Sequence, residues 1–340
     1  MFQSSVLYLL LVVLGGRYAF ADVAVPVSPP LWSGFEADFG KVDAGCAPVS
    51  PVTETPAGWF QVQKLPGGIY GFMEHGHSEM VNSFLIPGAA KDVLYDTGMG
   101  IASIREAIDF VRAREGLPSN PIMVINSHAH LDHVGGNREF ESVHVFKDPW
   151  TTDVLGKGIQ PGTWTAYYAA LLPPPAPRPP AGFDPALQNV PPLAWSKLRY
   201  LEPGQRIDLG NKVLRVLKTT SHTSADVVLY EEAGNVLFTG DAFTPIAFLA
   251  NNLKQFERDV TALAELPLNC HFNTHGPLVI NTAWLKRVSE AMRAINEGDY
   301  LESTTDLFGL ALPTYAHGDV HRIVDARKLL SSYPEAPGAQ

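Results

Sequence analysis

The residues best suited to chemistry are histidines and aspartates gathered in one short segment. Residues 127–136 read SHAHLDHVGG, so four side chains that can bind a metal fall within six positions. In an extended backbone, residues two apart point to the same side, so the first two histidines can bind one ion. The Asp-His pair just beyond them is then free to face a second ion. The four residues are His128, His130, Asp132 and His133.

Three further candidates follow later in the chain. His222 and Asp241 each come after a predicted strand, and His275 comes after a predicted helix. An α/β framework presents functional groups at such turns. Imidazole and carboxylate groups in this number suit zinc or iron better than calcium or magnesium, which prefer oxygen ligands only. An isolated His-x-His pair would be weak evidence, but seven residues in this order are not expected by accident.

The elements that must position these residues are predicted from apolar runs and their period. Several strands are followed by a helix and by a strand that leads into the histidine segment, and further strands and two helices come later, which fits an α/β framework. The predicted strands cover residues 69–74, 81–86, 93–96, 122–126, 213–218, 227–230 and 236–239, with a hairpin turn at 231–235. The predicted helices cover about 101–114, 253–263 and 284–295, and the last ends at Gly298.

Two proline-rich segments lack any period. Residues 22–58 predict an extended N-terminal arm. In residues 147–198, ten prolines lie between positions 161 and 192, among several aromatic residues. Proline at this density excludes a helix interior and a central strand, so we expect a long ordered loop, either a lid over the site or a rigid structural wrap. The main domain is predicted to cover 59–300, with 301–340 as a C-terminal extension packing on it.

The N-terminus predicts export. Residues 6–14 read VLYLLLVVL, and Ala19-Phe20-Ala21 follows as a small-residue cleavage pattern. Nine residues span about 13 Å as a helix, much less than the ~30 Å bilayer core, which favours a signal peptide over residues 1–21. Residues 1–5 contain no Lys or Arg, which departs from the usual pattern. We expect a secreted or periplasmic protein without a transmembrane span, cleaved after Ala21.

Composition narrows the partners. The formal net charge is −10 and no basic run reaches five residues, so nucleic acid is not expected as a partner. The two cysteines, Cys46 and Cys270, form no Cys-x-x-Cys motif, which excludes a thiolate zinc site. They could form one disulfide in an oxidising compartment or remain two thiols, and the sequence leaves both open. The expected partner is a small-molecule substrate, and the oligomeric state is not predicted.

The chain-wide order His-x-His-x-Asp-His, then His, Asp and His, resembles the metallo-β-lactamase superfamily. The resemblance covers about residues 59–300, including Asn82 and the run Asp96-Thr97-Gly98. It implies a four-layer αβ/βα sandwich with two zinc ions, iron or manganese being the alternatives. By this resemblance, His128, His130 and His222 bind the first metal, Asp132, His133 and His275 bind the second, Asp241 bridges both, and Asp96 orients a ligand loop.

The resemblance also narrows the chemistry. Secreted β-lactamases of the superfamily typically carry Cys or Ser where this chain has Asp241, whereas thioesterases, lactonases, phosphodiesterases and sulfatases carry Asp. Flavodiiron oxygen reductases carry Glu where this chain has His130. We therefore expect an exported dinuclear zinc hydrolase, in which a bridging hydroxide attacks an ester, thioester or lactone carbonyl. Asp132 is expected to be its catalytic residue, orienting the hydroxide and carrying its proton.

Several alternatives remain. Persulfide dioxygenases keep this ligand set with a single iron, a β-lactamase is a weaker alternative, and a nuclease resembling ribonuclease Z is disfavoured by the acidic charge. A binding protein on a degraded site is disfavoured because all seven positions are filled. The surroundings of His222 and His275 depart from glyoxalase II. Residues that contact the substrate are not predicted, although His75 and His77 fall in a loop that often faces the substrate in this family. The remaining histidines, assigned to structure or surface, are His144, His271, His317 and His321.

Overall fold

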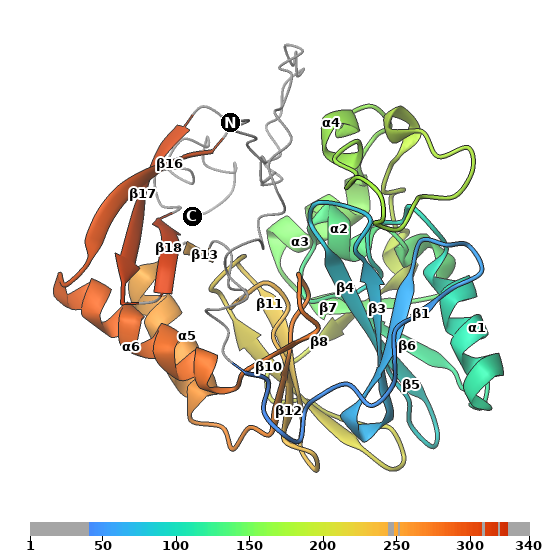
Figure 1. Cartoon of the computed structure of the whole chain (residues 1–340), viewed down its shortest axis with the longest axis horizontal. Helices are drawn as coiled ribbons and strands as arrows, with labels where there is room; N and C mark the ends of the chain where they lie inside the picture. Colours follow the sequence, from blue (N-terminus) through green and yellow to red (C-terminus); the bar gives the residue numbers. More distant parts are fainter. Residues whose placement is uncertain (1–40, 244–247, 251, 308–309, 319, 326–340) are drawn as a thin grey trace.

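Two β-sheets that face each other form the centre of the described chain (Figure 1). The computed structural model describes residues 41–325 except 244–247, 251, 308–309 and 319. The predicted signal peptide and the first part of the predicted arm therefore lie outside the described residues. No helix within these described ranges has the length and apolar character needed to cross a membrane.

The first sheet has eight strands in chain order, from β1 to β8. Its first five strands are antiparallel, and β5 to β8 are parallel. The parallel part needs crossover connections, and these carry the helices of its outer face. The strands are β1 (Thr53–Glu54), β2 (Gln61–Leu65), β3 (Ile69–Glu74), β4 (Val81–Ile86), β5 (Asp92–Tyr95), β6 (Ile122–Ile125), β7 (Val143–Phe146) and β8 (Leu198–Leu201).

The second sheet has six strands in the order β15-β14-β12-β11-β10-β9. Neighbours are antiparallel except β12 and β14, which run parallel. A parallel pair needs a crossover connection, and the chain between these two strands supplies it with helix α5. The strands are β9 (Arg206–Asp208), β10 (Val213–Thr219), β11 (Asp226–Glu231), β12 (Val236–Phe238), β14 (Cys270–Phe272) and β15 (Val279–Ile280).

Side-chain alternation in the strands creates separate cores on the two faces of each sheet. In β5, Val93 and Tyr95 pack between the sheets, while Leu94 packs toward the helices on the outer face. In β11, Leu229 packs between the sheets and Val228 packs against the helices on the other side. Burial on both faces explains why these strands are apolar throughout. The result is the expected four-layer αβ/βα sandwich.

Helices cover the outer face of each sheet. Helix α1 begins at the cap Ser103, whose side chain accepts from Glu106 N, and ends at Gly116, whose φ of 66° suits glycine. Helices α5 and α6 pack together over the second sheet. The helices are α1 (Ile104–Glu115), α2 (Leu131–Val134), α3 (Pro149–Lys157), α4 (Thr165–Tyr168), α5 (Leu253–Ala264) and α6 (Ala283–Glu297), with short 3-10 turns at Pro66–Gly68, Asn137–Glu139, Pro185–Leu187 and Trp195–Lys197.

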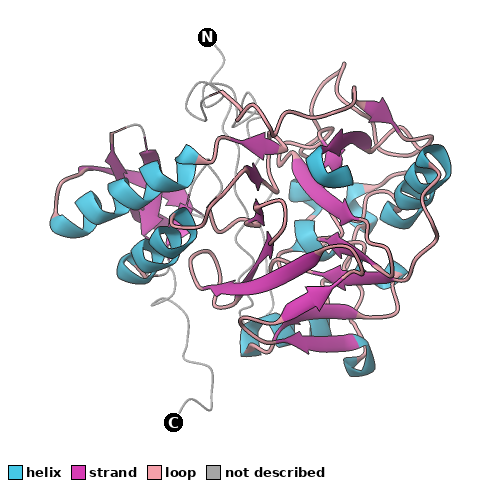
Figure 2. Ribbon diagram, turned by 90° about the horizontal axis from the view of Figure 1, so that it is seen from below, coloured by secondary structure: helices cyan, strands magenta, loops and turns pink. Residues whose placement is uncertain are grey.

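A third sheet has four strands in the order β13-β18-β17-β16, of which β13 precedes α5 in the sequence and the other three follow α6. Strands β17 and β18 contact α6, so the sheet lies at the side of the molecule where α5 and α6 pack, as Figure 2 also shows. The sequence predicts only an extension over residues 301–340 and none of these strands. They are β13 (Phe248–Ala250), β16 (Leu301–Leu307), β17 (Leu310–His317) and β18 (Val320–Asp325).

The Cys46–Cys270 pair is a disulfide, which decides between the two alternatives that the sequence left open. The Cα atoms lie 5.4 Å apart, and both residues are buried between the sheets. The bond ties the segment before β1 to strand β14. Nearby, Thr282 N donates to Asp43 Oδ2 at 2.7 Å, which anchors the same segment to the start of α6.

Candidate metal centre

The seven candidate ligands come from loops at the ends of strands in both sheets. Strand β6 of the first sheet leads to His128 and His130, and helix α2 follows at once with Asp132 and His133. In the second sheet, three separate connections supply the rest. His222 lies between β10 and β11, Asp241 follows β12, and His275 lies between β14 and β15. Residues spread over 148 positions of sequence are thereby brought together at one place.

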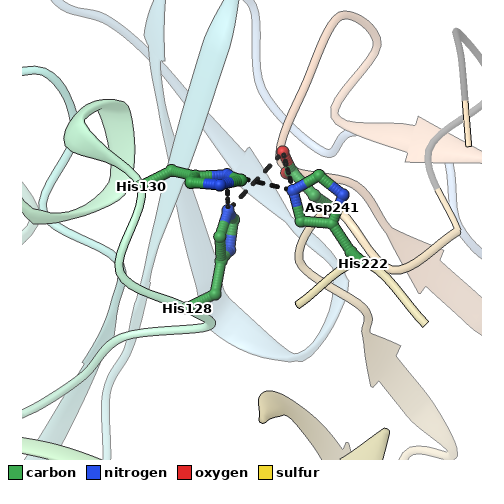
Figure 3. A group of neighbouring side chains, drawn as sticks. All are labelled: His128, His130, His222 and Asp241. Atoms are coloured by element: carbon green, nitrogen blue, oxygen red, sulfur yellow. Dashed lines mark hydrogen bonds and ion pairs between the residues drawn. The ribbon is translucent and has the colours of Figure 1, made fainter. Parts of the chain in front are cut away.

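The first group consists of three histidines and Asp241, which point toward one another (Figure 3). His130 Nδ1 lies 2.8 Å from His128 Nε2 and 3.0 Å from His222 Nε2. Asp241 Oδ2 lies 3.9 Å from His128 Nε2 and 3.7 Å from His222 Nε2. These are the residues expected around the first metal.

The second group consists of Asp132, His133 and His275. Asp132 Oδ2 lies 3.3 Å from His133 Nε2 and 3.4 Å from His275 Nε2, and the two imidazole nitrogens are 3.3 Å apart. Asp241 also faces this group, with its oxygens 3.4 Å from His133 Nε2 and 3.1 Å from His275 Nε2. Asp241 therefore stands between the two groups, where the resemblance places a bridging carboxylate.

The separations within each group fit a metal ion. Tetrahedral zinc bonded to nitrogen and oxygen at about 2.0–2.1 Å holds its ligand atoms about 3.3–3.4 Å from one another. The donor atoms here lie 2.8–3.9 Å apart along the pairs given above. Five imidazoles and two carboxylates, buried or nearly buried, form a donor set suited to a transition metal rather than to calcium or magnesium.

Asp96 holds two of the ligand-bearing segments. Its Oδ2 accepts from His133 Nδ1 at 2.9 Å and from Ser127 Oγ at 2.7 Å, and its Oδ1 accepts from Ser127 N at 2.6 Å. The Ser127 hydroxyl in turn accepts from His128 Nδ1 at 2.9 Å. Both imidazoles therefore present Nε2 to the centre. Asp96 lies where the sequence analysis expected a carboxylate that orients a ligand loop.

Two aspartates hold the loop that carries His222. Asp226 accepts from His222 N at 2.9 Å and from Thr223 N at 2.8 Å. Asp259, on α5, accepts from Thr220 N at 3.0 Å. The sequence analysis did not single out Asp259, because nothing in the sequence connects a helix residue to a loop 39 positions away.

The first hairpin supports the loop of His275. Glu79 accepts from His275 Nδ1 through its backbone oxygen at 2.7 Å, which leaves His275 Nε2 facing the centre. Asn82, on β4, donates to Asn273 O at 2.9 Å and to Gly276 O at 3.0 Å. His75 Nε2 donates to Asn82 Oδ1 at 3.0 Å, so His75 helps to hold the side chain that supports the His275 loop.

The two groups differ in their protonation. Burial, followed by the neighbouring His222, lowers the pKa of His130 to about 3, which keeps it a neutral imidazole with a free lone pair. Burial also disfavours the charged form of His275, but Asp241 and Asp132 outweigh it and raise its pKa to about 9. The two carboxylates thus stabilise positive charge in the second group. A bound divalent cation would be stabilised by the same carboxylates in place of the proton on His275.

Aromatic side chains from the proline-rich segment lie beside the centre. The half-buried Trp150 ring, on α3, stands edge-to-face to the His130 ring with centroids 5.5 Å apart. Tyr167, on α4, is buried, and burial together with Asp132 and Glu79 raises the pKa of its phenol well above the usual value. Its hydroxyl therefore stays protonated. Tyr167 is one of the aromatic residues of the segment predicted as a loop, but neither it nor Trp150 was predicted as a site residue, and neither of the helices that carry them was predicted.

Comparisons with known proteins agree with this arrangement. The family model of the metallo-beta-lactamase superfamily matches residues 78–321. The chicken (Gallus gallus) acyl-coenzyme A thioesterase MBLAC2 is 29% identical over 191 residues, 54% of this chain and 65% of that protein. The human (Homo sapiens) protein of the same name is 25% identical over 248 residues, 64% of this chain and 83% of that protein. A structure of a double mutant of the sec-alkyl sulfatase PisA1 is similar in fold, with a TM-score of 0.51 and 20% identity over 70% of this chain and 42% of that one.

Proposed function

Because the chain belongs to the metallo-beta-lactamase superfamily, we propose that it is a metal-dependent hydrolase of acyl thioesters with two metal ions, zinc first among them. Asp241 carries this proposal. Its oxygens lie 3.1–3.9 Å from imidazole nitrogens of both donor groups, so one carboxylate can serve two ions. Two such ions would be suited to hydrolysis, because they would lower the pKa of a bound water and polarise the carbonyl oxygen that it attacks.

The substrate class is supported by the relatives. The chicken and human proteins are named acyl-coenzyme A thioesterases. The chain spans only 65% of the length of the chicken protein, and we propose thioester hydrolysis for it on the names of these relatives together with the geometry of the site. An ester or lactone carbonyl presents the same geometry to the site, and these substrates belong in the same assay.

Asp132 is the residue that we propose to move the proton. Burial alone would raise its pKa, but His133 and His275 hold it well below its usual range. The side chain is therefore an ionised carboxylate within the second donor group, the form that can accept a proton from attacking water and return it to the leaving group. Bound divalent ions would supply water of lowered pKa and polarisation of the carbonyl oxygen.

Metal analysis combined with a substrate panel tests the proposal. Mass spectrometry of the purified protein should find about two metal ions per chain. Chelation should abolish hydrolysis of short acyl thioesters, and zinc should restore it. The panel should also contain chromogenic esters, lactones and a cephalosporin. A protein that is fully active without metal would refute the proposal, and one iron per chain with oxygen uptake would favour the dioxygenase alternative.

A further inference from the structure

The loop between β3 and β4 forms a short ladder with the segment after α4. Ser78 N donates to Ala170 O at 2.9 Å, and Leu172 N donates to Gly76 O at 2.8 Å. His77 lies between these two bonds and pairs with the facing strand as an isolated antiparallel bridge. Two segments about 90 positions apart in the sequence are thus joined through their backbones.

Gly76 permits this close approach. A Cβ atom at this position would lie 2.3 Å from Pro177 O and 2.6 Å from the Trp59 ring, closer than real Cβ atoms come to other atoms. Any larger residue would therefore push the hairpin loop and the proline-rich segment apart. The loops around α4 lie above the sheet that contains β3 and β4 in the view of Figure 1.

The His77 ring is fully buried, and both of its nitrogens are bonded across this contact. Nε2 donates to Tyr167 O at 2.7 Å, and Nδ1 accepts from Glu79 N at 3.2 Å. A carbonyl can only accept and an amide N–H can only donate, so the ring must be the neutral tautomer with hydrogen on Nε2. The ring also packs against the Tyr167 ring, with centroids 5.1 Å apart.

Both partners of His77 lie next to the metal centre. Glu79 holds His275 through its backbone oxygen. Tyr167 lies on α4, a helix of only four residues. A helix that short is not stable by itself, so its place depends on contacts such as the one with His77. Its phenol lies within the field of Asp132 and Asp241.

We infer that His77 is a positioning residue, which fixes residues 165–172 on the hairpin loop that supports His275 and thereby forms a wall of the substrate site that includes Tyr167. The inference rests on the proposed hydrolase function. His77 touches neither the donor atoms nor the reacting atoms, and it acts through the segment that it holds. Loss of the His77 imidazole removes one donor to Tyr167 O, which also accepts from Ala170 N at 3.0 Å, and so loosens the wall, while none of the seven candidate ligands is itself replaced.

A pair of substitutions separates the two bonds of His77. In His77→Gln, the side-chain amide nitrogen reaches the position of Nε2 and can still donate to Tyr167 O. In His77→Asn, the shorter amide can accept from Glu79 N but cannot reach Tyr167. We expect His77→Asn to raise KM for the thioester by roughly tenfold, the effect of one lost buried hydrogen bond, with kcat and metal content nearly unchanged. His77→Gln should restore KM to near the wild-type value.

Hydrogen exchange of the amides of Ser78 and Leu172, measured without substrate, tests the positioning independently of activity. Both amides should exchange faster in His77→Asn than in the wild type and in His77→Gln. If His77→Asn does not fold, His77→Phe replaces it in both measurements. Phenylalanine keeps an aromatic ring at this position and lacks both ring nitrogens. Unchanged exchange, or equal KM values for the Asn and Gln variants, would overturn the inference. Faster exchange in a protein that hydrolyses none of the substrates would leave the positioning intact and remove the proposed function.

Discussion

Asp132 and Asp241 are both carboxylates among the candidate histidine ligands, but they differ in how many of the two donor groups they contact. Asp241 faces nitrogens of both donor groups, whereas Asp132 belongs to the second group and lies within 3.4 Å of the Nε2 atoms of His133 and His275. A residue shared by two metals is expected to be needed for holding them. A residue bound at one of them retains an oxygen for proton transfer. Substitution at the two positions should therefore have different effects.

Asp132→Asn should lower kcat on the order of 10²–10⁴-fold, because a neutral amide cannot accept the proton that an ionised carboxylate takes. The substrate affinity should change much less. Steady-state kinetics, with metal content measured on the same sample, check this. Near-native turnover in a variant that keeps both metals would show that the proton acceptor lies elsewhere, with Asp241 as the next candidate.

The control for this variant is His144→Ala. His144 lies on β7, and its ring donates to Val124 O at 2.9 Å on the neighbouring strand, outside both donor groups. Its replacement should leave metal content and turnover almost unchanged. Equal damage from the two substitutions would mean that the assignment of the motif is wrong.

Asp96→Asn tests the support of the second donor group. The backbone of Asp96 has a φ of 63°, a conformation that asparagine tolerates better than most residues, so the loop itself should persist. The amide cannot provide the two accepting oxygens that His133 and Ser127 use. We expect metal affinity to fall by roughly 10–100-fold, measured by competition with a chromogenic chelator. An affinity within twofold of the wild type would contradict this role.

The sequence predicts the donor residues far better than their support. The seven candidates are recognisable because their side chains carry the chemistry. Glu79 supports His275 through a backbone oxygen, which leaves no trace in residue type. Asp259 reaches Thr220 only after the second sheet and α5 are assembled.

At the scale of elements, long apolar runs make a strand recognisable in the sequence, whereas a short strand such as β14 is missed even though it is buried. Strands β3 and β4 are buried throughout, and their predicted limits agree with those observed. Strand β16 reads LESTTDL, and its first residues are exposed, so no apolar alternation marks it. Helix α3 was not predicted, although its first residues carry a helix-start pattern. Asp148 caps it by accepting from Thr151 N, and Pro149 occupies its first turn.

Strand β14 contains a buried histidine that allows a prediction on pH. Burial lowers the pKa of His271 to about 3, and its Nδ1 has no hydrogen-bond partner among the described residues. The folded pKa lies below the unfolded value of ~6.5, so the unfolded chain takes up the proton first as the pH falls. The stabilisation is complete above pH ~6.5 and is lost progressively toward pH 3.

His271→Leu should remove this part of the pH dependence. Between pH 6.5 and 4, the free energy of unfolding should fall less in the variant than in the wild type, measured by urea denaturation at each pH. Comparing the two proteins cancels the titration of other buried groups. At neutral pH the variant should be about as stable, because leucine leaves no unpaired ring nitrogen and Thr239 loses a single partner. Parallel pH profiles would contradict the assignment.

At the scale of the whole molecule, we propose that the protein is exported. The predicted signal peptide lies outside the described residues, so the proposal depends on the sequence pattern. Cleavage after Ala21 should leave Asp22 as the first residue of the mature protein. Mass-spectrometric sequencing of the native N-terminus checks this. A native chain that begins at Met1 or Phe2 would refute it.

The disulfide should stabilise the whole fold, because it restricts the unfolded chain over a separation of 224 residues. Replacing both cysteines by alanine should lower the free energy of unfolding by roughly 2–4 kcal/mol. The donor residues are unchanged, so metal content should be retained. Denaturation of the variant beside the oxidised wild type measures the difference. Equal stability of the two proteins would show that the bond is dispensable.

The position of the two cysteines also sets an order of events during synthesis. Cys46 leaves the ribosome 224 residues before Cys270, an interval of roughly 10–45 s at 5–20 residues per second. Its thiol has no partner until the last strands of the second sheet have been made. Because the bond joins the segment before β1 to β14, an oxidised pair marks a nascent chain whose two ends of the sandwich have met. Alkylation of newly made protein would therefore read the progress of assembly directly from the chemistry of two sulfur atoms.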